Sequence, residues 1–600
     1  MKKKSLYCLS IHSGHVAGAA LSCDGKIVQC VSEERFNWQK NYLGYPRQSI
    51  DYVLTAAGIT AADLDLVVLP SRYGAPIVST QEVQAQMALI LWLYRPINII
   101  RQLWGILVYY LPPLSGIGRL LYRVMAYTLG RYTASKEKSV IAKHLHIPRE
   151  KIIELEHHFS HAATAYLGSP LNKQTALVFT LDGEGDLLCS SVSVAEGGKI
   201  CRIAATPREY SLGWMYYYVT KYFGMKPNEH EYKVMGLAPY AKDRDVQKVY
   251  DQIKDIIYLN PKNKLTFKAK FHMQNMEYFL RKKVFWARFD NLAGAIQKLL
   301  EDRVVEWIKE GIAATGISTV ILSGGVFMNV KANQKIAELD EVKKIFIFPS
   351  CGDESLAIGA CYVGYQRLIK QQGRQADICP ISDLYLGPSY SNEEIERFLK
   401  KENYFAKYTI DKLEKIEERV AQLLAQGQVV GRLSGRMEWG ARALGNRSLL
   451  ANPQDPDVVM VLNEQMKDRD FWMPFTPSVL DRCARNYIKN PKKISAPYMI
   501  MTFDTTKLGK KDLKAAIHPY DFTCRPQVLE KSWNVKYYSL IEAFEKLTGI
   551  GAVLNTSFNL HGLPIVLGPR EAMYVFENSG LEFLAMENFL VRKSSPTHAE

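Results

Sequence analysis

Apolar and polar residues alternate in this chain in a way that predicts two related groups of β-strands. Residues 6–35, LYCLSIHSGHVAGAALSCDGKIVQCVSEER, alternate on both sides of the turn Cys23–Lys26, as a β-hairpin does. The pattern returns at residues 175–203, TALVFTLDGEGDLLCSSVSVAEGGKICRI, where a strand runs into glycines and a second strand follows. Together with STVILSGGVFMNVKANQKI at 318–336, these stretches predict an α/β domain with two duplicated nucleotide-binding halves.

A change of composition near residue 380 predicts a domain boundary. The stretch KQQGRQADICPISDLYLGPSYSNEE, residues 370–394, separates the first domain from alternating helical and strand patterns that continue to the end of the chain. We therefore predict a first α/β domain over residues 1–380 and a second α/β domain over 381–600.

One segment of the first domain is unusual, because residues 83–136 contain no Asp or Glu and are rich in Leu, Ile, Trp and Tyr. A spanning helix needs about 20 apolar residues, and Arg95, Pro96, Arg101 and Pro112 interrupt every apolar run before that length. Two interpretations remain open. The segment is either an insertion that packs on the core or a partner subunit, or a peripheral membrane contact through residues 86–130.

The overall composition excludes several classes of protein. A formal charge of +15 is spread along 600 residues without a nucleic-acid motif, so we expect anionic small ligands rather than nucleic acid. The 10 Cys form no CxxC pair, which argues against a zinc ribbon or a disulfide framework. Without a signal-peptide pattern at the start, a cytoplasmic location is expected.

The stretch LEHHFSHAATAY, residues 155–166, places His157 and His161 on one face of a helix, four residues apart. The zinc-protease pattern H-E-x-x-H needs Glu after the first His, and His158 stands there instead. Asp182 and Asp353 each follow an apolar strand and complete a donor set suited to Fe(II), Mn(II) or Zn(II). A surface or core His pair and two turn aspartates remain the alternative.

Three glycine-bearing turns follow predicted strands: Ser13-Gly14-His15, the stretch 182–186 and Ser323-Gly324-Gly325. Glycine lets the backbone approach phosphate oxygens with its N–H groups pointing inward. Any one of them could be an ordinary tight turn. In this order, however, the three are what a duplicated actin-like ATPase core requires.

Eight separated blocks carry a resemblance to a known family: HHFSHAATAY, LDGEGD, HEYKVMGLAPY, LSGGVFMNVKAN, CGDESLAIGA, GRMEWGARALGNRSLLANP, HPYDFTCRPQV and NTSFNLHGLPIV. In this order they resemble the NodU/CmcH family of O-carbamoyltransferases over nearly the whole chain. The resemblance implies an N-terminal Kae1-like domain of the actin-like ATPase class, followed by a YrdC-like domain.

The resemblance also implies roles for individual residues. His157, His161, Asp182 and Asp353 match the family's metal ligands, usually for iron. The nucleotide-binding stretches of the first domain match at Gly183, Gly185, Gly324, Gly325 and Asn329. The carbamoyl phosphate and adenylate site matches at Arg442, Arg447, Lys467, Arg469, Arg525, Ser557 and Asn559.

The expected catalytic residues are His15, Arg442, Lys467 and Arg469. His15 matches the histidine that the family places beside nucleotide and acceptor, and we expect it either to accept the acceptor's proton or only to contact phosphate or metal. Three positions depart from the family pattern: Val16 replaces an acidic residue, Met473 replaces an arginine, and Leu563 replaces a glutamate. Because of Met473, a phosphate contact is expected to shift to Arg447 or Arg436.

The resemblance implies an ATP-dependent O-carbamoyltransferase. Such an enzyme converts carbamoyl phosphate and ATP to carbamoyladenylate and transfers the carbamoyl group to a hydroxyl of a small molecule, which could be a natural product, a sugar or a toxin alcohol. It uses a divalent metal, with Fe²⁺ expected, and Mg²⁺ with ATP; a homodimer is left open. The alternatives are carbamoyl or threonylcarbamoyl transfer to tRNA or a maturation protein, and an actin-like scaffold without transfer chemistry.

Overall fold

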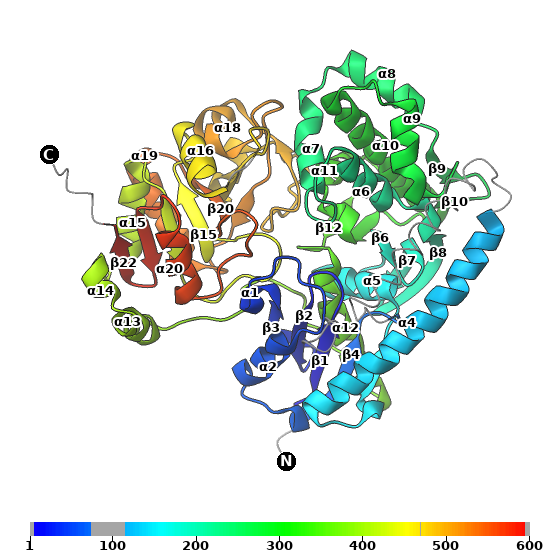
Figure 1. Ribbon diagram of the computed structural model, residues 1–600, viewed down its shortest axis with the longest axis horizontal. Coiled ribbons are helices and arrows are strands. Elements are labelled where there is room, and N and C mark those ends of the chain that lie inside the picture. Colours follow the sequence, from blue (N-terminus) through cyan, green and yellow to red (C-terminus); the bar gives the residue numbers. More distant parts are fainter. Residues whose placement is uncertain (1–4, 74–114, 468–469, 594–600) are drawn as a thin grey trace. The chain divides into compact units, whose positions relative to one another are not determined.

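The computed structural model describes residues 5–73, 115–467 and 470–593 (Figure 1). The chain forms two compact units. The first comprises Met1–Glu33 and Asn41–Ile381, and the second comprises Glu34–Lys40 and Ser382–Glu600. Both units combine helices with β-sheets, so each belongs to the mixed α/β class.

The first sheet of the first unit has the strand order β3-β2-β1-β4-β5. Its strands are β1 (Tyr7–His12), β2 (Gly18–Cys23), β3 (Lys26–Ser32), β4 (Leu64–Leu69) and β5 (Ile152–Glu154). Neighbouring strands among β1, β2 and β3 are antiparallel, whereas β4 is parallel to both β1 and β5. The hairpin predicted around the turn Cys23–Lys26 is therefore confirmed.

The second sheet repeats this plan. Its order is β12-β11-β6-β7-β8, with strands β6 (Ala176–Gly185), β7 (Leu188–Glu196), β8 (Lys199–Pro207), β11 (Thr319–Ser323) and β12 (Lys344–Ile347). Again three antiparallel strands are followed by two that continue the sheet in parallel. The two sheets share strand order and strand direction, so the first unit contains the duplication that the alternation pattern predicts.

Two helices, α5 (His157–Leu167) and α12 (Leu356–Gln371), pack against each other in the first unit. Helix α12 contacts β1, β2 and β4 of the first sheet, while α5 contacts β6 and β11 of the second. The helices approach closely because position 359 is glycine: a Cβ there would lie 2.3 Å from the hydroxyl oxygen of Thr164. This packing brings the start of α5 to the carboxyl ends of β6 and β11.

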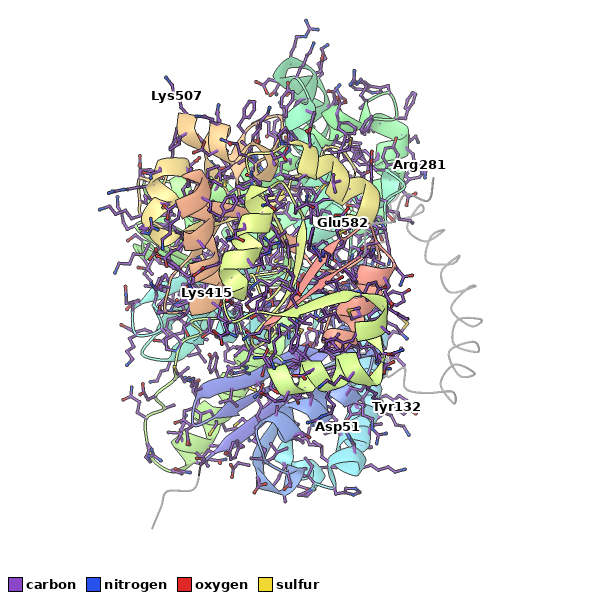
Figure 2. All side chains as sticks on the ribbon, turned by 90° about the vertical axis from the view of Figure 1, so that its left-hand side faces the viewer. Asp51, Tyr132, Arg281, Lys415, Lys507 and Glu582 are labelled. Atoms are coloured by element: carbon purple, nitrogen blue, oxygen red, sulfur yellow. The ribbon has the colours of Figure 1, made fainter. Side chains whose placement is uncertain are left out.

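Helix α4 (Ser115–Leu145) is the described part of the acid-free segment and its continuation. Its buried side is formed by Ala134, Glu137, Ile141 and Leu145, at helical spacing. On the opposite side Tyr132, labelled in Figure 2, is 60% exposed. Residues 74–114 lie outside the described residues, and the interpretation of 86–130 as a membrane contact stays a prediction. Among the helices described, none combines the length and apolar character that membrane crossing requires.

The second unit is built on one eight-stranded sheet of order β13-β22-β21-β14-β15-β20-β16-β19. Its strands are β13 (Thr409–Lys412), β14 (Val430–Leu433), β15 (Arg447–Ala451), β16 (Thr476–Leu480), β19 (Gln527–Leu529), β20 (Ala552–Ser557), β21 (Phe583–Met586) and β22 (Phe589–Arg592). Helices α13 (Asn392–Lys401), α16 (Asp457–Leu462) and α20 (Pro569–Glu577) contribute buried apolar side chains to the same core as β14, β15, β20 and β21.

The register of these strands brings several strand ends to one edge of the sheet. Leu433 pairs with Arg447, Ser448 with Ser557, and Thr476 with Asn555. Consequently the carboxyl ends of β14 and β20 lie beside the amino ends of β15 and β16. The parallel pair β16 and β19 adds the amino end of β19 to the same edge.

The short segment Glu34–Lys40 belongs to the second unit, although it lies between β3 and α2 (Arg47–Ala56) in the sequence. It carries the buried Arg35, whose guanidinium donates to the Gly440 carbonyl at 2.9 Å. Trp38 packs edge-on against Tyr574, with ring centroids 5.0 Å apart. The hydropathy pattern did not predict that this N-terminal segment belongs to the second unit.

Candidate active site

Four predicted metal ligands come together at the amino end of α5. His157 and His161 occupy its first two turns, Asp182 lies on β6, and Asp353 precedes α12. The Nε2 atoms of His157 and His161 lie 3.3 and 3.2 Å from Oδ2 of Asp182, and each lies 3.5 Å from Oδ1 of Asp353. All four donor atoms lie within 4.8 Å of one another.

These distances fit a shared metal ion. Ligand atoms bound at about 2.0–2.2 Å around a tetrahedral ion are separated by about 3.3–3.6 Å. The four imidazole–carboxylate separations of 3.2–3.5 Å match that spacing, within a donor set that extends to 4.8 Å. Two imidazole nitrogens with two carboxylate oxygens suit Fe(II), Mn(II) or Zn(II).

Hydroxyl groups orient both imidazoles. The Oγ of Ser71 lies 3.2 Å from Nδ1 of His157, and the Oγ of Ser323 lies 3.3 Å from Nδ1 of His161. With Nδ1 engaged in this way, the Nε2 atoms point toward the two carboxylates. Outer partners of this kind fix the ring orientation in metal sites.

The predicted glycines lie around these ligands. A Cβ at Gly185 would come within 2.1 Å of the His157 ring, so only glycine leaves room for that imidazole. Gly324 has φ +104°, and a Cβ there would lie 2.3 Å from the Leu181 carbonyl oxygen. A Cβ at Gly325 would lie 3.0 Å from Oδ1 of Asp182, and the Gly183 N–H donates to the same oxygen at 2.7 Å. The observed role of these glycines is to position the predicted metal ligands. That they bind a nucleotide stays a prediction.

The electrostatics of the cluster favour a positive charge between its members. Burial lowers the pKa of His157, but Asp353 and Asp182 more than offset it and raise the pKa to about 9. Burial opposes ionisation of Asp182 as well, yet both histidines hold the pKa of that carboxyl well below its usual range. A bound divalent ion places positive charge at the same position.

His158 turns away from this cluster. Its Nδ1 lies 2.8 Å from the Thr180 hydroxyl, which in turn contacts Ser191. The side chain is completely buried, and burial keeps the pKa of its imidazole well below the ordinary value. His158 is therefore a neutral core residue.

A cavity of about 270 Å³ adjoins the metal cluster. His12, Ser13, Glu137, His157, Glu184 and Asp353 are among the side chains that line it. Among the described residues, its lining includes four carboxylates and no Lys or Arg. Sequence reasoning missed His12 and Glu137; the signal for Glu137 was a lone acid on an otherwise apolar helical stripe.

His12 and His15 are placed differently. His12 is buried in the cavity wall, and its Nε2 donates to the His15 carbonyl at 3.0 Å. Burial lowers the pKa of His12 to about 4, although Asp353 opposes the shift. The predicted base His15 is only half-buried and does not line this cavity. Its role stays a prediction.

Asn329, predicted to contact nucleotide, is held by protein groups. Its side chain caps α11 (Val330–Glu338) by accepting the Ala332 N–H at 3.0 Å. It also exchanges two hydrogen bonds with the Gln297 amide, at 2.9 and 3.0 Å. These hydrogen bonds already fix the orientation of the Asn329 amide, and its contact with a nucleotide stays a prediction.

In the second unit, the predicted phosphate-binding residues flank the edge where the strand ends meet. Ser557 ends β20 and donates to the Asn559 amide oxygen at 2.7 Å, while Arg525 precedes β19. Arg442 lies in the loop before β15. Arg469 and the side chain of Lys467 lie outside the described residues, so their predicted catalytic roles stay predictions.

Glu438 organises the loop that carries Arg442. This buried carboxylate accepts the backbone N–H groups of Leu444, Asn446 and Arg447 through one oxygen, at 2.6–3.2 Å. Three N–H donors are therefore fixed around a single anion. Sequence reasoning did not identify this residue, because its partners are main-chain groups.

The prediction for Arg447 requires a correction. Its side chain is completely buried, and its guanidinium donates to the carbonyls of Pro388, Ser434, Gly435, Asn446 and Leu567 at 2.9–3.3 Å. A guanidinium committed in this way holds loops together and does not reach a phosphate. Arg436 likewise donates to the Leu386 and Gly387 carbonyls.

Comparisons with known proteins cover most of the chain. The family model described as carbamoyltransferase N-terminus matches residues 8–362, and that described as carbamoyltransferase C-terminus matches residues 421–593. The chain is 33% identical to protein MJ1058 of Methanocaldococcus jannaschii, over 84% of this chain and 81% of that protein. It is 30% identical to protein sll1178 of Synechocystis sp., over 98% and 96%.

A third relative is the nodulation protein NolNO of Sinorhizobium fredii, 28% identical over 96% of this chain and 79% of that protein. Among solved structures, HypF of T. kodakarensis shares 13% identity over 60% of this chain and 48% of its own, with a TM-score of 0.32. That score is too low to support an argument. On the two family models and these relatives, the chain belongs to the carbamoyltransferase family and is a transferase enzyme.

Proposed function

We propose that this enzyme is an ATP-dependent O-carbamoyltransferase that forms carbamoyladenylate and transfers its carbamoyl group to a hydroxyl of a small molecule. The observation that carries the proposal is the cluster of His157, His161, Asp182 and Asp353, two of which, His157 and Asp353, line a cavity. It supplies a cation-binding centre beside a space large enough for a small acceptor group.

The second unit suits the first half-reaction. Carbamoyl phosphate and ATP are both anions. Water releases the phosphate of carbamoyl phosphate as inorganic phosphate, and the carbamate oxygen then bonds to the α-phosphate of ATP while pyrophosphate leaves. Phosphates require positive charge and bidentate donors, and Arg442 and Arg525 offer both at this strand edge. Ser557 and Asn559 lie at the same edge. Arg442 and Arg525 are the described candidates for this work, and Lys467 and Arg469 complete the proposed set.

The first unit suits the second half-reaction. The four ligands would hold a divalent ion, with Fe²⁺ proposed, and when bound the ion supplies a Lewis acid that polarises a carbonyl. Ser71 and Ser323 keep the imidazoles oriented for it. The repeated strand order supports an actin-like, Kae1-like identity for this unit, which would bind ATP with Mg²⁺; a YrdC-like identity is proposed for the second unit.

The cavity also bears on the acceptor. Among the described residues, the cavity is lined by carboxylates and by no Lys or Arg, which favours a neutral or cationic alcohol over an anionic one. Its volume of about 270 Å³ favours a small group over a macromolecular surface. The volume in particular favours a small-molecule alcohol over tRNA as the acceptor.

Pyrophosphate release from ATP tests the proposal. With purified protein loaded with Fe²⁺, release should require carbamoyl phosphate, and mass spectrometry should detect carbamoyladenylate. Release without carbamoyl phosphate would indicate an ATPase scaffold instead. No pyrophosphate release under any condition would contradict the proposed function as a whole.

A further inference from the structure

Glu137 of helix α4 lines the cavity beside the cluster of predicted metal ligands, which we call the metal cavity. Glu137 is 4% exposed and lies on the buried stripe of α4, between Ala134 and Ile141. The other members of this stripe are apolar, so the fold places a carboxyl where packing alone calls for a methyl or methylene group. Residues buried against this expectation in a cavity are candidates for function.

The surroundings of Glu137 connect it with the metal cluster. It lines the same cavity as His157 and Asp353, two of the four ligands, and as Ser13 at the end of β1. Ala126 of the same helix also lines this cavity. Helix α4 therefore closes one side of the site and brings in a carboxyl that is not one of the ligands.

Burial sets the protonation of Glu137. It raises the pKa of this carboxyl to about 7, although the Ser13 hydroxyl opposes the shift, and Glu154 on β5 adds to it. Tyr45, from the loop before α2, also faces this carboxyl, and Glu154 itself is paired with Arg131 and Lys138 of α4. The titratable groups that share the cavity lining are His12, Tyr73, His157, Glu184, Asp186 and Asp353. A carboxyl with a pKa near neutrality exchanges protons readily at the pH where an enzyme works.

We propose that the Glu137 carboxylate accepts the proton that the acceptor hydroxyl loses as its oxygen attacks the carbamoyl carbon; this inference rests on the function proposed above. The hydroxyl oxygen forms the new bond to the carbamoyl carbon. The bond from that carbon to the adenylate oxygen breaks, and AMP leaves with the electron pair. The proton stays on Glu137 until it passes to solvent.

The other carboxylates and imidazoles of the cavity are engaged elsewhere. Glu184 is paired with Arg208 at 2.6 Å, and Asp186 accepts the backbone N–H groups of Arg72, Tyr73 and His157. His12 holds its Nε2 proton against the His15 carbonyl. Asp353 and His157 belong to the ligand set. Burial is the largest influence on the pKa of Glu137, as it is for Asp186, but Asp186 already accepts three backbone N–H groups.

The test compares Glu137→Gln with wild type in the two half-reactions. Because the acceptor is unidentified, water serves as the hydroxyl probe, and AMP release under single-turnover conditions reports transfer. Glu137→Gln should keep its metal content and its pyrophosphate release, while AMP release falls by about 10²–10⁴-fold. Glu150→Gln, on the exposed turn after α4, is the matched control and should behave as wild type.

The pH profile separates a base from a structural residue. In wild type, AMP release should fall as the pH drops below about 7, because the base must be a carboxylate. Glu154→Gln removes a charge that raises the pKa of Glu137, so it should move this limb to lower pH without abolishing transfer. Infrared difference spectra should show a protonated carboxyl that titrates in the same range and is missing in Glu137→Gln.

Three outcomes would overturn the inference. They are AMP release by Glu137→Gln at the wild-type rate, an unchanged acidic limb in that variant, and a carboxyl already ionised at pH 5. A wild-type protein that releases no pyrophosphate contradicts the proposed function instead, so the two failures are distinguishable.

Discussion

The metal cavity of the first unit and the strand edge of the second unit both bury charged side chains, but they satisfy them differently. At the strand edge, Arg447 donates to five carbonyls and Glu438 accepts three N–H groups, so each buried charge has main-chain partners. In the cavity, two imidazoles and two carboxylates converge on one another within 4.8 Å.

This difference separates a structural charge from a functional one. A buried guanidinium such as that of Arg447, whose N–H groups donate to backbone carbonyls, stabilises loops and has little left for a ligand. Donor atoms that converge on a common point are stabilised by a cation placed there. By this criterion, Arg447 belongs to the architecture of the second unit, and His161 is a candidate metal ligand of the first.

The largest effect is expected from His161→Ala. Removing one of four ligands should weaken Fe²⁺ binding by more than about 100-fold and abolish carbamoyl transfer, because the ion loses a neutral nitrogen donor. Carbamoyladenylate formation should continue. Metal analysis and both half-reaction assays check this result, with the exposed His146→Ala as control. A variant with full metal content would break the assignment of the cavity.

Arg447→Met tests the opposite side of the comparison. The substitution removes a guanidinium that donates to five carbonyls, of which those of Pro388 and Asn446 keep a backbone N–H donor, and it should destabilise the second unit by about 3–5 kcal/mol. Denaturant unfolding measures this loss, and Arg485→Met on an exposed helix is the control. If stability is retained while adenylate formation is lost, Arg447 contacts phosphate after all.

Arg525→Ala addresses the chemistry proposed for the strand edge. Pyrophosphate release should fall by about 10²–10³-fold, because phosphate charge is left without a preorganised cation. Metal content and stability should stay near those of wild type, which distinguishes this arginine from Arg447. Release at the rate of the Arg485→Ala control would place the phosphate site elsewhere.

The smallest expected effect is a pH dependence of stability in the first unit. The pKa of Glu137 is raised to about 7 in the folded state, so its contribution is fully present below about pH 4.5 and is lost as the pH rises through 7. Glu137→Gln should therefore gain stability relative to wild type between pH 5 and pH 8, by at most about 3 kcal/mol. Unfolding curves at both pH values measure this gain. A difference that stays constant with pH would show that Glu137 is ionised throughout.

Some parts of the molecule follow from local sequence alone. The alternation around Cys23–Lys26 and at 175–203 predicted both antiparallel groups of strands, although the fold buries most residues of β1, β2, β6 and β7 on both faces. The four-residue spacing of His157 and His161 places both imidazoles on one helix face whatever surrounds them. The positions of Asp182 and Asp353 after apolar strands made them candidate partners, with turn residues as the alternative, and the resemblance to a family then favoured the metal interpretation.

Other parts were decided only by tertiary structure. The sequence did not identify Glu137 or Glu438 as buried and predicted that Arg447 contacts phosphate, whereas the fold buries all three. The place of Glu34–Lys40 in the second unit depends on contacts such as that between Arg35 and Gly440, 405 positions apart. The hydrophobic period indicates which side of a helix or strand is buried, but it does not indicate which groups of the protein that side contacts. Whether a buried charge meets a carbonyl, a carboxylate or an open cavity depends on elements that come together only when the chain folds.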